Sequence, residues 1–327
     1  MARTTLSAAA LAAWAASTLA VSVADTAWDN CKANAPDLSI AGCTEVLQRN
    51  ALTTANRAAA FYNRANSYFA KRDWDKAIAD YSEAIRLNPA YAAAFNNRGN
   101  AYLNKGDRDR AIADYSEAIR VSPNYALAFR NRGNAFFARR DWDKAIADYS
   151  DAVRLNPKDA PAFNSRGNSH LNKGDRDKAI ADYSEAIRLD PKFAIAFANR
   201  GLAYSQKRDW DHAIADYSDA VRLNPNHAAA FSGRGFAHAQ TGDWDGAIAD
   251  YGEAIRLKPD SSAFSSRGLA YFRKGELDRA IADFDDAIRL NPGDAKAYAG
   301  RGAAYAKKGA WYRGIVDYGT ALRLVKK

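Results

Sequence analysis

Cysteine, proline and histidine are scarce in this chain of 327 residues, which has two, nine and four of them respectively. So few cysteines exclude a fold that is held together by many disulfides, and so few prolines exclude a proline-rich disordered chain. No run of five like charges occurs, although the net charge is +9. The chain therefore lacks the basic tail of many nucleic-acid-binding proteins, and we interpret its alternating acids and bases as a solvated helix surface.

The sequence also lacks the combinations of residues that form catalytic sites. The four histidines are scattered, and no Ser/His/Asp set, metal-ligand spacing or phosphate-binding loop occurs. His170 and His238 take the place that Tyr102 has in another copy of the repeat described below, which favours packing in the core. The sequence predicts no enzyme, no cofactor and no metal site.

The first 24 residues have the pattern of an export signal. Arg3 precedes an apolar stretch from Leu6 to Val23, and Ser22-Val23-Ala24 fits the small-x-small cleavage rule. We expect cleavage after Ala24 and a periplasmic or secreted protein, with no stable membrane insertion afterwards. An uncleaved membrane anchor is the alternative, because the stretch is close to spanning length.

The two cysteines, Cys31 and Cys43, lie close together in a segment, 25–57, that we expect to form an N-terminal capping hairpin. Pro36-Asp37 between them is typical of the turn of such a hairpin. In an oxidising compartment the two thiols should form a disulfide; a pair of buried free thiols is the alternative. A metal site is excluded because no histidine or further cysteine lies nearby.

The rest of the chain repeats one phrase. The phrase Ala77-Ile78-Ala79-Asp80-Tyr81 returns at residues 111, 145, 179, 213 and 247, each 34 residues after the last. Variants of it begin at residues 280 and 314. Prolines keep the same rhythm from Pro89 to Pro292. A fixed period of this size indicates stacked supersecondary units, none of which can bury its own apolar face alone.

Each unit is expected to contain two helices. In residues 92–125, the first helix should run from Ala92 to Lys105 and end at Gly106. The second should run from Arg108 to Val121, with Asp107 as its cap. Inward positions hold aromatic residues that fill space and small residues that let helices approach: Phe95, Gly99, Tyr102, Ala111, Tyr115 and Ala118.

This pattern of an aromatic, Gly, Tyr, Ala, aromatic, Ala and Pro at set places resembles the tetratricopeptide repeat (TPR), and the chain is similar to TPR proteins that bacteria export. The resemblance implies an all-α, right-handed α-solenoid of about eight units, which acts as a non-catalytic scaffold for a protein or peptide and not for nucleic acid. The units are 58–91, 92–125, 126–159, 160–193, 194–227, 228–260, 261–294 and 295–327.

One departure from the family pattern recurs in every unit. An arginine stands where the family usually has leucine before the glycine of the first helix, as at Arg132. The aspartate of the phrase, such as Asp148, occurs equally often. We expect the two to pair between helices and to tie the stack together.

Asparagines mark a candidate binding surface on the first helices. Pairs spaced by three residues share one helical face, and an amide offers both donors and acceptors to a peptide backbone. The resemblance implies a concave groove lined by Asn63, Asn66, Asn97, Asn100, Asn131, Asn134, Asn168 and Asn199. The alternative is that these asparagines are a family default without a ligand.

The asparagine rows stop in the later units, where Leu202, Phe236 and Leu269 replace the second asparagine. Arg273 and Lys307 add positive charge there. We therefore expect a groove with a polar first half and a more apolar, basic second half. A competing function is assembly, because the chain has no polar helix after the eighth unit and an open end can form a homodimer.

Overall fold

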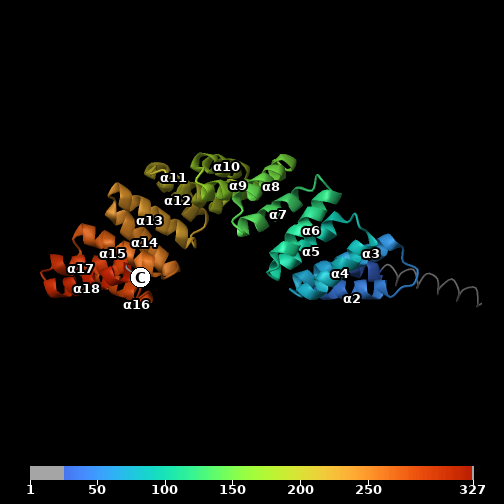
Figure 1. The fold of residues 1–327 in the computed structure, drawn as a ribbon, viewed down its shortest axis with the longest axis horizontal. Coiled ribbons are helices and arrows are strands. Elements are labelled where there is room, and N and C mark those ends of the chain that lie inside the picture. The colour runs from blue at the N-terminus through green and yellow to red at the C-terminus, as the bar shows by residue number, and fades with distance from the viewer. Residues whose placement is uncertain (1–25, 326–327) are drawn as a thin grey trace, which may run out of the picture. The chain divides into compact units, whose positions relative to one another are not determined.

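The computed structural model describes residues 26–325, and the described helices form two compact units, which divide between residues 157 and 158. The expected signal, residues 1–24, lies outside the described residues. The described part of the chain is helical and contains no strand (Figure 1). The all-α solenoid of helical hairpins that the sequence predicts is confirmed.

The N-terminal unit starts with a helical segment over residues 26–31, followed by seven longer helices. Their bounds are α2 Pro36–Leu47, α3 Thr54–Ala70, α4 Trp74–Leu87, α5 Ala92–Asn104, α6 Arg108–Val121, α7 Ala126–Ala138 and α8 Trp142–Leu155. Each helix packs on the helices before and after it in this unit.

The C-terminal unit contains ten helices, packed in the same sequential way among its own members. Their bounds are α9 Ala160–Lys173, α10 Arg176–Leu189, α11 Ala194–Gln206, α12 Trp210–Leu223, α13 Ala228–Thr241, α14 Trp244–Leu257, α15 Ser261–Lys274, α16 Leu277–Leu290, α17 Ala295–Lys307 and α18 Trp311–Val325.

Local chemistry sets these helix ends. Asp107 precedes α6, and its Oδ1 accepts a hydrogen bond from the backbone N–H of Arg110 at 3.1 Å. The turn before it needs a left-handed residue, which is Gly106 with φ 86°. In three other repeats the same place holds an arginine with φ near 60°, a conformation that costs energy for any residue with a Cβ. These residues are Arg72, Arg140 and Arg208.

The core of each hairpin is built from the phrase. Tyr115 and its neighbour Ala118 are fully buried, and Tyr115 lies against the first helix at Gly99. A Cβ on Gly99 would sit 2.7 Å from Cε1 of Tyr115, so the close approach requires glycine. The expectation that small residues let the helices approach, while aromatic rings fill the space between them, is confirmed at Gly99 and Tyr115.

The arginine–aspartate pairs that the sequence predicts are present in every repeat. Nε and Nη2 of Arg132 each donate to Asp148 at 2.8 Å, a two-pronged geometry. Nη1 of the same arginine donates to Oγ of Ser116, in the preceding repeat, at 3.0 Å. The pair therefore joins the two helices of one hairpin and also ties that hairpin to its neighbour.

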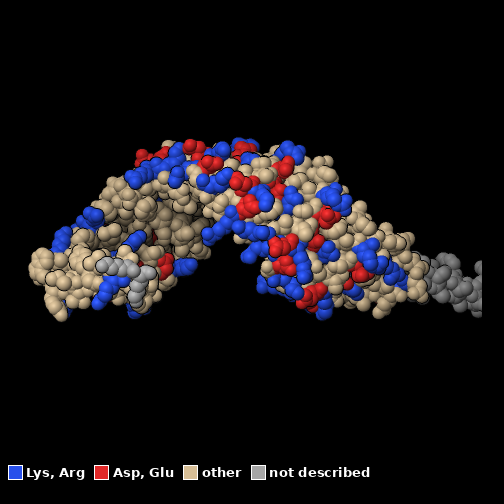
Figure 2. Space-filling view, viewed as in Figure 1, with Lys and Arg blue, Asp and Glu red and all other residues tan. Residues whose placement is uncertain are grey.

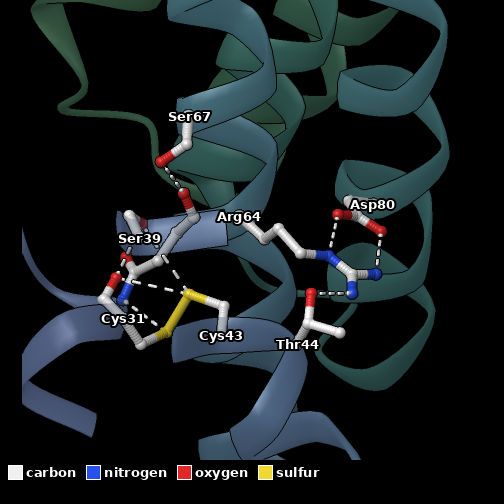
Figure 3. Close-up of a disulfide and its surroundings, with 8 residues drawn as sticks. Cys31, Ser39, Cys43, Thr44, Arg64, Ser67 and Asp80 are labelled. Atoms are coloured by element: carbon white, nitrogen blue, oxygen red, sulfur yellow. Dashed lines mark hydrogen bonds and ion pairs between the residues drawn. A yellow bond between two sulfur atoms is a disulfide. The ribbon is translucent and has the colours of Figure 1, made fainter. Parts of the chain in front are cut away.

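The N-terminal hairpin is closed by the disulfide between Cys31 and Cys43 (Figure 3). Both cysteines are buried, and Oγ of Ser39 donates to the carbonyl of Cys31 at 3.0 Å. The prediction of a turn at Pro36-Asp37 is wrong, because α2 already begins at Pro36. Proline is favoured at a first helical position, where its missing N–H has no intrahelical partner to lose.

Candidate functional site

The asparagines of the predicted groove all lie on first helices of the hairpins. Asn63, Asn66, Asn97, Asn100, Asn131 and Asn134 belong to α3, α5 and α7 of the N-terminal unit, and Asn168 and Asn199 belong to α9 and α11 of the C-terminal unit. All are half-buried except Asn134, which is exposed. The amides are therefore within reach of solvent and of a ligand, but each also contacts the protein.

The first asparagine of each pair connects neighbouring hairpins. Nδ2 of Asn97 donates to Oδ1 of Asn66 at 3.0 Å and to the hydroxyl of Tyr62 at 3.1 Å. Nδ2 of Asn131 donates to Oδ1 of Asn96 at 2.9 Å. These bonds run from one first helix to the next, so part of the row stabilises the stack.

The C-terminal unit has the same link once, from Nδ2 of Asn199 to Oδ1 of Asn164 at 2.9 Å. Sequence reasoning missed Asn96 and Asn164, which are buried. Their position, one residue before the predicted row, was the only available signal.

The second asparagine of each pair is held by the tyrosine of the phrase. The Tyr115 hydroxyl donates to Oδ1 of Asn100 at 2.7 Å, and burial raises the pKa of Tyr115, which keeps its proton in place. Three more pairs have the same geometry: Tyr81 with Asn66, Tyr149 with Asn134, and Tyr183 with Asn168.

This anchoring fixes the direction of the amide. Because Oδ1 faces the tyrosine, the NH₂ group of Asn100 faces away from it, and within residues 26–325 that group has no protein acceptor. The same holds for the NH₂ groups of Asn66, Asn134 and Asn168 among the described residues. Within the N-terminal unit, Asn66, Asn100 and Asn134 therefore form a row of oriented donors, which suits carbonyl or carboxylate oxygens.

The later repeats present a different lining. Leu202, Phe236 and Leu269 stand in the place of the second asparagine, and each is more than 40% exposed. The expected apolar character of the second half is confirmed for these residues. Figure 2 shows a hollowed surface in the C-terminal unit on which charged side chains are sparse.

The remaining groups offer little chemistry. No cluster of histidine, cysteine and acidic side chains suited to a metal ion occurs among residues 26–325. Burial lowers the pKa of His170, and its Nδ1 has no hydrogen-bond partner. Within the same residues no helix is both long and apolar enough to span a membrane.

Two family models match the chain. One is described as TPR repeat and matches residues 65–106, 167–208 and 268–309. The other is described as tetratricopeptide repeat and matches residues 96–160 and 199–262. No match is found among curated proteins.

Three solved structures with the same fold cover different shares of this chain. YrrB, described as a TPR protein with an unusual peptide-binding site, is 25% identical, with a TM-score of 0.50 over 61% of this chain and 97% of its own. A tetratricopeptide repeat protein from Parabacteroides merdae ATCC 43184 is 22% identical, with a TM-score of 0.55 over 71% of this chain and 93% of its own. A chain of the APC/C hetero-tetramer Cut9–Hcn1 is 17% identical, with a TM-score of 0.55 over 90% of this chain and 57% of its own.

Proposed function

The chain belongs to the tetratricopeptide-repeat family, and from that premise we propose that it is a protein-interaction scaffold that binds an extended polypeptide along the first helices of its repeats. The observation that carries the proposal is the row of asparagine NH₂ groups that buried tyrosines orient away from the core. Every peptide unit has a carbonyl acceptor, so such a row binds a backbone whatever its side chains. YrrB is a relative whose description includes a peptide-binding site.

The test replaces two of the anchored amides by the residue that later repeats already have there. Random dodecapeptides displayed on phage are selected against the chain, and the affinity of a selected peptide is measured for the Asn100→Leu/Asn134→Leu variant. Two lost hydrogen bonds of about 1 kcal/mol each should weaken binding about tenfold or more. The fold should tolerate both changes, because leucine occupies this place at Leu202 and Leu269.

The matched control adds two leucines on the outward faces of α6 and α8, where Ala113 and Ala147 are exposed. The Ala113→Leu/Ala147→Leu variant should bind the peptide as the parent chain does. Equal affinity of all three proteins would refute the groove. The broader variant with Asn97, Asn100, Asn131 and Asn134 all changed to Ala should bind still less, and full-strength binding there would also refute it.

We further propose that the protein is exported and works in an oxidising compartment. The support is the signal-like pattern of residues 1–24 in the sequence and the pairing of Cys31 with Cys43. Mass spectrometry of the protein from its native cell should give a chain that starts at Asp25. A chain that keeps residues 1–24 in the membrane fraction would favour the anchor instead.

A second candidate function is self-association through α18. Its Trp311, Ile315 and Leu322 are each more than 60% exposed. In inner repeats the equivalent apolar positions, such as Ile78 and Ile85, are half-buried. An uncovered apolar helix face of this kind favours contact with another protein surface.

The polar groups that connect one repeat to the next are absent from α18. Asp75 pairs with Lys105 of the following repeat, and Ser82 accepts a hydrogen bond from Arg98. The corresponding places in α18 hold Tyr312 and Gly319. A further repeat would therefore find no polar partners there, so we expect two α18 faces to meet in a closed, two-fold dimer rather than a filament.

Light scattering tests this second function. The parent chain should be a dimer at micromolar concentration, and Ile315→Glu/Leu322→Glu should be a monomer. The Leu38→Glu variant introduces one such negative charge far from α18 in the sequence, at an exposed leucine, and should remain a dimer. A monomeric parent chain would end this proposal and leave the groove proposal intact.

A further inference from the structure

A pocket of about 800 Å³ opens in the C-terminal unit, between α13, α14, α15, α16 and α17. We call it the Trp244 pocket. Its lining combines serines and charged residues with an apolar and aromatic part, which is formed by Phe236, Trp244, Tyr251, Leu269 and Phe284. A cavity of this size and lining is typical of a site that buries apolar side chains.

The pocket exists because the ring that fills this place in other repeats is missing. In the first and third repeats, Phe69 packs edge-on against Trp74, and Phe137 against Trp142, with ring centroids 4.8 Å apart. The sixth repeat has the tryptophan, Trp244, but has Ala239 where the phenylalanine stands.

The fifth repeat shows how such a gap can be closed. Ser205 replaces the phenylalanine there, and Phe236 of the next repeat packs edge-on against Trp210 at 5.8 Å. The residue that corresponds to Phe236 one repeat later is Leu269, which has no ring. Neither of these two rings is therefore available to Trp244, whose side chain borders the pocket.

Small residues deepen the same place. Gly300 lines the pocket where Asn97 and Asn131 stand in earlier repeats. A Cβ on Gly300 would lie 2.4 Å from Cζ of Phe284, so any other residue would collide with that ring. Three repeats thus each place a smaller or non-aromatic residue here, at Ala239, Leu269 and Gly300.

The rim of the pocket has charged groups of both signs. Arg273 and Lys296 line the pocket, and neither has a carboxylate partner among residues 26–325. Asp260 and Asp294 also line it, and both carboxylates accept hydrogen bonds from neutral groups of the chain. Asp294 accepts from Ser261 at 2.6 Å, from Ser265 at 2.8 Å and from the backbone N–H groups that follow it.

Oδ1 of Asp260 accepts from the Ser262 hydroxyl at 2.6 Å and from the N–H of Ala263 at 2.9 Å, so this carboxylate is held as the cap of α15. Arg273 and Lys296, which have no carboxylate partner among the described residues, are the groups that can pair with an incoming carboxylate.

We propose that the Trp244 pocket binds a bulky apolar side chain, preferably aromatic, of a polypeptide that has a carboxylate next to that side chain. The ring packs against Trp244 in the place that Phe69 and Phe137 take in their own repeats, and the carboxylate meets Arg273 and Lys296. This inference rests on the proposed scaffold function. It adds which type of residue in the bound polypeptide the C-terminal unit recognises.

Fluorine NMR with a small probe tests the pocket apart from the asparagine row. The probe is a phenylpropionate fluorinated on its ring, and its amide serves as the uncharged analogue. We expect the full chain to broaden the fluorine line of the acid. The Arg273→Gln variant should weaken binding of the acid about fivefold, as for a partly exposed ion pair, and leave binding of the amide unchanged.

The Ala239→Phe variant supplies the missing ring and should weaken binding of the acid about 10- to 100-fold, the value of burying one aromatic side chain. It should fold, because the same phenylalanine–tryptophan contact occurs twice in the chain. Ala306→Phe makes the identical change in the eighth repeat, outside the pocket, and should bind the probe normally.

Two results would overturn the inference: no broadening by the parent chain, or Ala239→Phe binding as well as Ala306→Phe. Equal affinity for acid and amide would overturn the carboxylate requirement. Neither result depends on Asn100 or Asn134, so failure of the pocket and failure of the groove are separate outcomes.

Discussion

The first helices of the N-terminal unit and those of the last repeats share one scaffold but have different linings. α5 and α7 present amides that Tyr115 and Tyr149 orient, whereas α13 and α15 present Phe236 and Leu269. The arginine–aspartate pair is the same in both regions. The comparison shows that the arginine–aspartate pair is constant while the lining varies between repeats, so in the proposed scaffold the lining is the part that selects the ligand.

The largest expected effect comes from breaking that shared pair in each region. Arg132→Ala leaves Asp148 buried without its partner and should lower the free energy of unfolding by about 3 kcal/mol. Arg267→Ala should cost about 1 kcal/mol less, because Gly252 stands where Ser116 serves Arg132 and Arg267 has one bond fewer to lose.

Urea denaturation measures both effects, and a double-mutant cycle of Arg132→Ala with Asp148→Ala isolates the pair. Coupling of at least about 1 kcal/mol is expected for groups in direct contact. Zero coupling would show that the pair does not hold the hairpin together.

The two ends of the chain give the next effect. The N-terminal hairpin contains a disulfide, whereas α18 has an exposed apolar face. Replacing Cys31 and Cys43 by Ser removes a cross-link across a short loop, which should destabilise the N-terminal hairpin by about 3 kcal/mol. Hydrogen exchange of α2 should accelerate strongly and that of α18 should not change. Equal acceleration at both ends would contradict a local role.

Exchanging the linings should give effects of opposite sign. Asn100→Leu leaves the buried Tyr115 hydroxyl without its acceptor and should destabilise the chain by about 1–2 kcal/mol. Leu202→Asn offers Tyr217 the acceptor that Asn168 gives Tyr183, and should be neutral or stabilising by up to about 1 kcal/mol. If the melting temperatures of the two variants shift in the same direction, the hydrogen bond from tyrosine to asparagine does not stabilise the repeat as described.

The smallest effect compares odd and even repeats. Arg140 has φ 60° where Gly106 and Gly174 stand in neighbouring repeats. Arg140→Gly should raise the free energy of unfolding by about 0.5–1 kcal/mol, because relief of the left-handed strain exceeds the entropy that glycine adds to the unfolded chain. Gly106→Ala should have the opposite sign in the same assay.

Much of the fold could be predicted because it repeats. The helices of residues 92–125, the arginine–aspartate pairs and the pairing of the two cysteines all follow from residue type and fixed spacing. The turn at Pro36 could not be placed, since proline suits both a turn and a first helical position.

The site was harder to predict than the fold. The asparagine face follows from a spacing of three, but the bond from Tyr115 to Asn100 depends on how closely two helices approach at Gly99. The Trp244 pocket depends on smaller or non-aromatic residues in three different repeats, a signal that no single motif contains.

The most direct test of the groove places a photo-crosslinking amino acid, benzoylphenylalanine, at Asn134 on the lining of α7 or at Ala147 on the outward face of α8. The account predicts covalent adducts with polypeptides from the native compartment at Asn134, reduced when Asn100→Leu is added, and none at Ala147. Equal adducts at the two positions, or adducts at Ala147 alone, would contradict a scaffold that binds its partner along the first helices.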